Sequence, residues 1–278
     1  MNVLEFTFLV WAGSLAAGFL GALTGLGGGV VLVPLLTIVF HVDLRYAIGA
    51  SLVSVIATSS GSAAAYVKEG FSNIRIGMFL EIATTTGALL GAYLTAKISP
   101  SAIAIIFGLM LMYSAYVSRR TRPRSAIEQP PDPLSTKLKM NGDFPDTSGM
   151  RHYNVYRVPA GFGVMFGAGA LSGLLGIGSG ALKVVAMDQA MKIPFKVSTT
   201  TSNFMIGVTA AASAGVYLSR GYIDPALSMP VMLGVLIGSL LGTRVLVKTQ
   251  TKQLRLVFSG VIVLLGLEML WKGITGGL

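Results

Sequence analysis

Cysteine is missing from this sequence, and charged residues are scarce. Without cysteine, neither disulfide bonds nor thiol chemistry contributes to the stability or function of the chain. Charged residues make up only 12% of the 278 residues, whereas hydrophobic residues make up 53%. That share of charge is about half the share found in an ordinary soluble protein. Because the few charges cluster in short gaps between long apolar runs, the composition predicts an integral membrane protein.

Acidic residues are especially few, 11 against 21 lysines and arginines, which leaves a formal charge of +10. Nucleic-acid binding is one interpretation of such a charge. However, the basic residues are spread over the gaps between apolar runs and form no basic face with interleaved aromatic residues. We therefore expect no nucleic-acid partner and interpret the positive residues as cytoplasmic loops of a membrane protein. Residues 1–5 lack the positive region of a signal peptide, so we expect the first apolar segment to be retained.

The sequence also contains no grouping of nucleophile, base and acid, and no cluster of potential metal ligands. This argues against an enzyme, and the sequence predicts neither a cofactor nor a bound metal ion.

Glycine, in contrast, is abundant and forms two runs inside apolar regions, Gly25–Gly29 and Gly176–Gly180, the latter with Ile177 and Ser179 between its glycines. Each glycine weakens a helix by about 1 kcal/mol relative to alanine. A helix break inside a bilayer persists only where it is buried in protein or lines a polar cavity. The apolar segment after each run has only about 11 residues, or roughly 16 Å of helix, against a hydrocarbon core of about 30 Å. The runs therefore predict two broken helices.

The two glycine runs are separated by 151 residues, and the same offset relates many other positions. Examples are the pairs Gly18 and Gly169, Ser51 and Ser202, Tyr66 and Tyr217, Gly87 and Gly238, and Lys97 and Lys248. This internal duplication divides the chain into a first transmembrane repeat (residues 1–118), a linker (residues 119–157) and a second transmembrane repeat (residues 158–278).

The expected fold is an all-α polytopic membrane protein with 8–10 membrane segments in two homologous halves. Apolar segments are predicted over residues 4–24, 30–40, 46–67, 76–96 and 101–117, and again over 158–175, 181–191, 197–218, 226–247 and 254–271. The linker is basic and rich in proline, so we expect it to be flexible and cytoplasmic.

The number of crossings decides how the halves are related. If all five segments of each half cross the bilayer, the halves are inverted repeats, which the excess of lysine in the inside loops of the second half favours. If the short segments re-enter instead, each half crosses four times and the repeats are parallel. We prefer the inverted arrangement.

The two glycine runs are the first candidates for a substrate site. Free backbone N–H groups and positive helix ends at such breaks suit an anion. The candidate residues in the runs are Gly27, Gly28, Gly29, Gly178, Ser179 and Gly180. The alternative is close helix packing through small residues, which we prefer for the pairs Gly87 and Gly91, and Gly238 and Gly242.

Several polar residues inside the apolar segments are further candidates. Lys183 lies three residues after the second run, where an ionisable residue indicates function; the alternatives are that it snorkels or pairs with Asp188. The hydroxyls of Ser51 and Ser202 and the amide of Asn203 are able to bind oxyanion oxygens, or alternatively to bond neighbouring helices. Asp188 and Glu81 are candidate proton carriers, with Glu81 alternatively close to a membrane boundary.

These residues resemble a known family. Gly18-x-x-Gly21-x-x-x-Gly25-Leu26-Gly27-Gly28-Gly29 with Pro34, followed by Ala50-Ser51-Leu52, is similar to the TauE/SafE sulfite exporter family, also called the toluene-sulfonate uptake permease family. Gly173-Leu174-Leu175-Gly176-Ile177-Gly178-Ser179-Gly180 with Thr201-Ser202-Asn203 resembles its second copy. Ser179 replaces the middle glycine of that copy, Val185 stands where the first copy has Pro34, and Lys183 is unusual in the general pattern. These departures leave the choice of substrate open.

The resemblance implies secondary transport of a small sulfur-containing anion, such as sulfite, thiosulfate or an organosulfonate, across the inner membrane. We expect alternating access between the two halves, with protons as a candidate coupling ion. Two alternatives belong to other classes: a passive anion channel, which shows no counterflow, and a non-transporting receptor or scaffold. In a receptor or scaffold the linker would carry the activity, so deletion of residues 125–150 would abolish it. We expect that deletion to leave transport largely intact.

Overall fold

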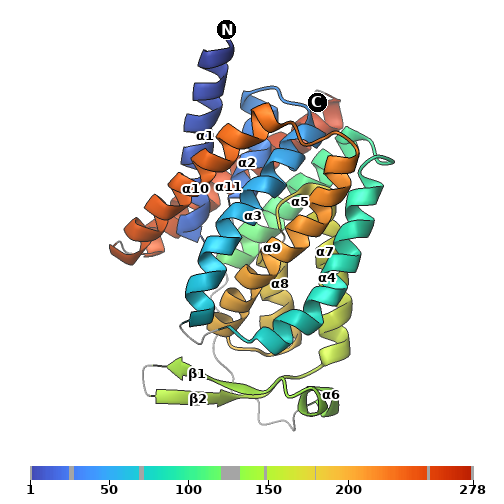
Figure 1. Ribbon diagram of the computed structural model, residues 1–278, viewed down its shortest axis with the longest axis vertical. Coiled ribbons are helices and arrows are strands. Elements are labelled where there is room, and N and C mark those ends of the chain that lie inside the picture. The colour runs from blue at the N-terminus through green and yellow to red at the C-terminus, as the bar shows by residue number, and fades with distance from the viewer. Residues whose placement is uncertain are drawn as a thin grey trace.

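The computed structural model describes residues 2–24, 28–68, 72–119, 132–146, 149–178, 180–248 and 251–276. Most of these residues form a bundle of long helices, and a small β-hairpin with a short helix lies against one end of the bundle (Figure 1). The mostly helical fold of a polytopic membrane protein is confirmed, whereas the all-α expectation is wrong at the hairpin.

The first half contains four long helices and one short interrupted one. Their bounds are α1 (Val3–Thr24), α2 (Gly29–Pro34) with the π-helical turn η1 (Leu35–Val39), α3 (Leu44–Lys68), α4 (Ile74–Leu94) and α5 (Pro100–Arg119). The second half contains α7 (Val158–Leu175), α8 (Gly180–Val185) with the π-helical turn η2 (Ala186–Ala190), α9 (Phe195–Ser219), α10 (Pro225–Lys248) and α11 (Thr251–Thr275).

The offset found in the sequence recurs in the element bounds. The short helices α2 and α8, their π-helical turns, and the pair α3 and α9 all begin and end 151 residues apart. The two non-glycine residues that follow the π-helical turns also match, since His41 has φ 53° and Lys192 has φ 59°. Such left-handed conformations are uncommon without glycine, so their repetition at one offset reflects the same local geometry in both halves.

Four helices among the described residues are long and apolar enough to cross a membrane. They are Leu4–Gly21, Ile74–Leu94, Val158–Leu175 and Pro225–Gly242. Shorter apolar helices cover Gly29–Val39, Leu44–Ser59 and Pro100–Tyr116. Many large apolar side chains on the long helices are exposed, for example Phe8, Ile82 and Leu240, and lipid is the environment that suits them.

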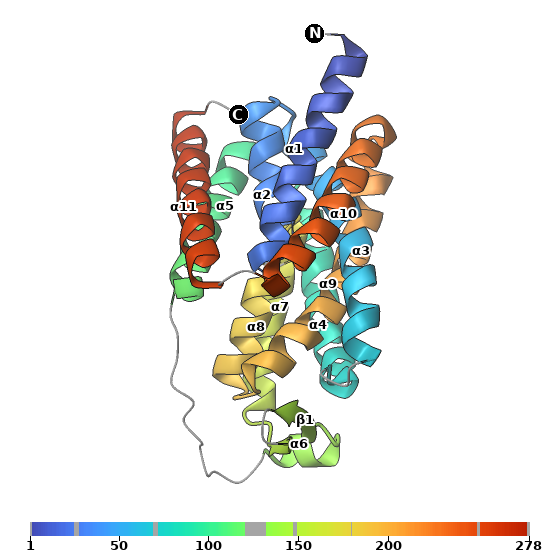
Figure 2. The same cartoon turned by 90° about the vertical axis from the view of Figure 1, so that its left-hand side faces the viewer.

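The helices pair mainly across the two halves. Helix α1 packs along α10, α4 along α7, α3 against α9, and α5 against α11, the last pair lying side by side in Figure 2. Glycines allow the backbones to approach closely in the α1–α10 and α4–α7 pairs. A Cβ atom on Gly91 or Gly173 of the α4–α7 pair, or on Gly238 of the α1–α10 pair, would collide with a backbone carbonyl oxygen of the facing helix. The close-packing interpretation of Gly87, Gly91 and Gly238 therefore agrees with their surroundings.

The prediction of a flexible linker is wrong for the second part of the linker, which is folded. Asp132 accepts a hydrogen bond from the backbone N–H of Leu134 and starts the short helix α6 (Pro133–Lys137), and strands β1 (Gly142–Asp146) and β2 (Gly149–Tyr153) form an antiparallel hairpin. Four apolar side chains of this segment are buried with the ends of the membrane helices: Met140, Phe144, Tyr153 and Val155. Deleting residues 125–150 would therefore remove buried packing as well as linker.

Asn73 attaches the hairpin segment to the bundle. Its side-chain oxygen caps α4 by accepting the N–H of Ile76, while its Nδ2 atom donates to the Met140 carbonyl at 2.9 Å and to the Tyr153 hydroxyl at 2.6 Å. Its backbone N–H donates to Thr201 Oγ1 at 3.0 Å. Burial raises the pKa of Tyr153, which keeps its hydroxyl protonated at neutral pH. The hairpin is thus joined through Asn73 to the start of α9.

Replacing Asn73 with alanine should loosen the hairpin and lower the stability of the bundle by about 1–3 kcal/mol, because a helix cap and two partly buried hydrogen bonds are lost. Asn73→Ser is the matched control, since serine is a good N-cap but too short to reach Met140. Limited proteolysis at residues 132–157 and thermal denaturation in detergent measure the two effects. Equal protease resistance of all three proteins would show that Asn73 does not hold the hairpin.

Candidate functional site

The second glycine run breaks the chain between α7 and α8. Helix α7 ends at Leu175, and Gly176 and Gly178 both adopt φ of 68°, a left-handed conformation that glycine reaches without a steric penalty. The Tyr217 hydroxyl, fully buried on α9, donates to the Gly173 carbonyl at 3.1 Å and also bonds Thr95. The predicted break is therefore confirmed, and Tyr217 holds the helix end that precedes it.

The first glycine run is described from Gly28 onward. Gly28 is the N-cap of α2, and residues 29–34 are all buried. Gly27 of the first run and Ser179 of the second, both predicted site residues, lie outside the described residues. Each short helix continues into a π-helical turn, a feature that occurs frequently at functional sites.

The two breaks meet through Ser51 on α3. The Ser51 hydroxyl is fully buried and donates to the Gly176 carbonyl at 2.8 Å. A Cβ atom placed on Gly29 would lie 2.7 Å from Ser51 Oγ and 3.2 Å from that same carbonyl oxygen. In the second half, Ser202 on α9 donates to the Gly180 carbonyl at 3.2 Å. The two equivalent serines therefore bond backbone carbonyls of the second break, and Gly29 lies against Gly176 in a closed arrangement.

Lys183 lies on α8, directly after the second break. Its side chain has 0% exposure, and its Nζ atom donates to Thr209 Oγ1 on α9 at 2.5 Å. Full burial and this hydrogen bond contradict the alternative in which Lys183 snorkels to the membrane surface. A lysine in an apolar interior is stable only when partners compensate its charge, so the groups around it matter.

Glu81 on α4 is the acidic partner in this cluster. Thr209 Oγ1 donates to Glu81 Oε1 at 2.6 Å, and Thr85 Oγ1 donates to the same oxygen at 3.0 Å. The other carboxylate oxygen, Oε2, is buried and has no hydrogen-bond partner among the described residues. Glu81 is only 8% exposed, so its carboxyl group is enclosed by protein. Thr209 thus joins Lys183 to Glu81 across three helices.

Thr209, Thr85 and Tyr217 are functional candidates that the sequence analysis did not select. One signal was available for Thr209, because Thr58 stands 151 residues before it and both fall in hydroxyl-rich segments. Two predicted residues remain outside the cluster that the described hydrogen bonds define. Asn203 is half-buried on α9, and Asp188 is half-buried in η2.

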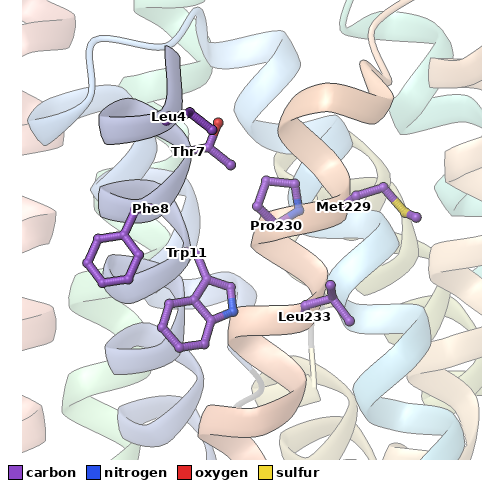
Figure 3. Close-up of a pocket in the computed structure, with 7 residues that line it drawn as sticks. All are labelled: Leu4, Thr7, Phe8, Trp11, Met229, Pro230 and Leu233. Carbon is purple, nitrogen blue, oxygen red and sulfur yellow. The ribbon is translucent and has the colours of Figure 1, made fainter. Parts of the chain in front are cut away.

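A separate hollow lies between α1 and α10 (Figure 3). It has a volume of about 450 Å³ and is lined by Leu4, Thr7, Phe8, Trp11, Met229, Pro230 and Leu233. Its lining carries no charge, so it suits an apolar chain such as that of a lipid better than an anion. Another hollow of about 280 Å³, where α4 meets the hairpin, is lined mainly by polar residues, including Asn73, Arg75, Asp143 and Tyr153.

The cluster at the breaks combines a buried cation, several hydroxyls and a carboxyl group. Among the described residues, no group of three or more His, Cys, Asp or Glu side chains is placed to hold a metal ion. A buried ammonium next to hydroxyl donors and freed backbone groups is able to bind a small anion. A carboxyl group beside the ammonium is able to exchange a proton.

Comparisons with known proteins identify the family of this chain. The sequence profile described as Sulfite exporter TauE/SafE matches residues 10–269. The chain is 29% identical to the probable membrane transporter protein YunE of Bacillus subtilis (strain 168), over 98% of this chain and 99% of that protein. It is 25% identical to a probable membrane transporter protein of Methanocaldococcus jannaschii, over 96% of this chain and 98% of that one.

A second Bacillus subtilis (strain 168) protein, the probable membrane transporter protein YdhB, is 27% identical over 82% of this chain and 83% of its own length. No solved structure matches the chain significantly. The family match spans nearly the whole sequence, and the matched relatives are membrane transporters rather than enzymes. The chain therefore belongs to the sulfite exporter TauE/SafE family of membrane transporters.

Proposed function

We propose that this chain is a secondary transporter of a small sulfur-containing anion, such as sulfite, thiosulfate or an organosulfonate. The observation that carries the proposal is Lys183, a cation with 0% exposure placed directly after the second helix break. A buried lysine is costly in a membrane protein, and a substrate that needs a positive charge in the interior is a reason to retain it. The family name supports a sulfur oxyanion as that substrate.

The surroundings of Lys183 give the site its polarity. In the closed arrangement the hydroxyls of Ser51 and Ser202 donate to carbonyls of the second break. Movement of the second break away from α3 and α9 would release these hydroxyls, together with the N–H groups of the break, toward an entering anion. The predicted binding residues Gly28, Gly29, Gly178, Gly180, Ser51, Ser202 and Lys183 then line one region, with Gly27, Ser179 and Asn203 proposed from the sequence alone.

Alternating access between inverted halves would expose this region to each side of the inner membrane in turn. The starting ends of the equivalent helices α1 and α7 support inversion, because α1 begins at the upper end of the bundle and α7 at the lower end beside the hairpin (Figure 1). The basic composition of residues 119–157 supports placing the hairpin end in the cytoplasm.

A binding screen and a counterflow assay test the proposal together. Sulfite, thiosulfate or sulfoacetate should raise the melting temperature of the purified protein, with a stabilisation of roughly 3–4 kcal/mol at 100–1,000 times the dissociation constant. Sulfate and taurine serve as the comparison ligands. In vesicles, an unlabelled anion that stabilises the protein should drive counterflow of the same radiolabelled anion.

The two alternatives give different results in the same assays. A passive channel would conduct the anion without counterflow, and a receptor or scaffold would bind without any flux. Absence of both stabilisation and flux for all the sulfur anions would overturn the proposed function itself.

A further inference from the structure

We infer that Glu81 is the proton-binding residue of this transporter and that its carboxylate competes with the transported anion for Lys183. The inference rests on the proposed function and adds a coupling ion with a defined site. In the empty protein Glu81 compensates the charge of Lys183. When an anion binds at Lys183, a proton neutralises Glu81.

The geometry of Thr209 is the first support. Its single hydroxyl accepts a hydrogen bond from Lys183 Nζ at 2.5 Å and donates to Glu81 Oε1 at 2.6 Å. The cation and the carboxyl group are therefore one hydroxyl apart, on α8 and α4, with Thr209 on α9 between them. A shift of α8 relative to α9 would separate Lys183 from Glu81 and open a position for another negative group beside the ammonium.

The second support is the unequal environment of the two Glu81 oxygens. Oε1 accepts hydrogen bonds from both Thr209 and Thr85, whereas Oε2 is buried and finds no partner within the described part of the chain. An ionised carboxylate is stabilised when both of its oxygens accept hydrogen bonds, and an unsatisfied buried oxygen costs free energy. Oε2 is therefore the atom that we expect to take up the proton when the anion binds.

Few other ionisable groups lie on the elements packed around Glu81 and Lys183. Helix α7, which packs along α4, has no ionisable side chain. The remaining groups on the packed elements are Arg75 and Tyr93 on α4, Lys196 and Tyr217 on α9, and Asp188 in η2. Arg75, Tyr93 and Lys196 are exposed, and Asp188 is half-buried. The buried Tyr217 donates its hydroxyl proton to the Gly173 carbonyl. Glu81 is thus the acidic group joined to Lys183 through Thr209.

Charge balance then fixes the coupling. The empty protein holds one ammonium and one carboxylate, and the loaded protein holds one ammonium, one neutral carboxyl group and one bound anion. For a monoanion both states are neutral within the bundle, which avoids the cost of an unpaired buried charge during the conformational change. The O–H bond at Glu81 forms with a proton from water on the side where the anion enters. Anion and proton therefore move in the same direction.

Glu81→Gln separates coupling from binding. Glutamine keeps the side-chain shape but cannot release a proton, so the loaded state still forms while the empty state carries an uncompensated Lys183. In vesicles, the wild-type protein should accumulate radiolabelled sulfite or thiosulfate when a pH gradient is imposed. Glu81→Gln should retain counterflow but lose gradient-driven accumulation. Glu268→Gln, the same change on α11, is the matched control and should behave as wild type.

Calorimetry of the binding of a simple alkanesulfonate gives a second readout, because a sulfonate is a monoanion that does not titrate near neutral pH. Titrations in two buffers of different ionisation enthalpy should reveal uptake of about one proton per bound anion in the wild type and none in Glu81→Gln. Wild-type binding without proton uptake, or gradient-driven accumulation by Glu81→Gln, would overturn the inference and leave the proposed function standing. Failure of the wild type to move any sulfur anion would overturn both.

Discussion

Replacing Lys183 with leucine should weaken anion binding and reduce uptake by about a hundredfold or more. The bound anion would lose its buried cation, and loss of one partner from a buried charge pair typically costs several kcal/mol. Leucine is the appropriate substitution, since Leu32 occupies the equivalent position of the first half and is itself fully buried. Initial uptake rates and dissociation constants for sulfite and thiosulfate measure the effect. Unchanged affinity would remove Lys183 from the substrate site.

A second variant separates this functional loss from misfolding. Lys183→Leu alone leaves Glu81 buried without its cation, and removal of one partner from a buried pair costs about 3–5 kcal/mol. The double variant Lys183→Leu with Glu81→Gln removes both charges and should recover most of the lost melting temperature. Transport should remain absent in the double variant. Recovery of transport along with stability would show that Lys183 has only a structural role.

Replacing Gly173 with leucine should prevent formation of a stable bundle, the largest structural effect that we predict. An added Cβ atom would collide with the Ala88 carbonyl on α4, and a backbone carbonyl in a packed helix cannot move aside as a flexible side chain can. Insertion of side-chain volume into a packed core usually costs about 1–3 kcal/mol, and backbone contacts lie at the upper end or beyond. The yield of monodisperse protein in detergent and its melting temperature are the measurements.

Gly167 on the same helix provides the control. A Cβ atom there would meet no atom within 4 Å, and the residue is exposed. Gly167→Leu should therefore express and melt like the wild type, and leucine also has the better helix propensity. Equal loss of protein in both variants would assign the effect to membrane insertion rather than to the contact between α4 and α7.

The sequence predicted the features of the fold that depend on local chemistry. A dense glycine run weakens the helix that contains it, so the break between α7 and α8 could be expected from the run Gly176–Gly180. Apolar length predicted the long helices, whose ends differ from the expectation by only a few residues. The internal offset predicted that the short helix after the first run has an equivalent after the second run, as the bounds of α2 and α8 confirm.

Contacts between distant segments could not be predicted in the same way. Thr209 connects Lys183 to Glu81, and the two hydrogen bonds join positions that are 26 and 128 residues apart in the chain. No local pattern specifies such a pairing without knowledge of which helices pack together. The hairpin was missed for a related reason. The linker as a whole is basic and rich in proline, and its few buried apolar side chains, such as Phe144, become significant only when they pack against the ends of α4 and α7.

The crossed pairing of the helices has a consequence for how such a molecule can be assembled. Because α1 packs on α10 and α7 packs on α4, the first helix of each half finds its main partner in the other half. A fragment that contains only one half would leave exposed to lipid the glycine-containing helix faces that form the α1–α10 and α4–α7 contacts. These helix contacts therefore form only when both halves are present, either in one chain or as two associated half-length chains.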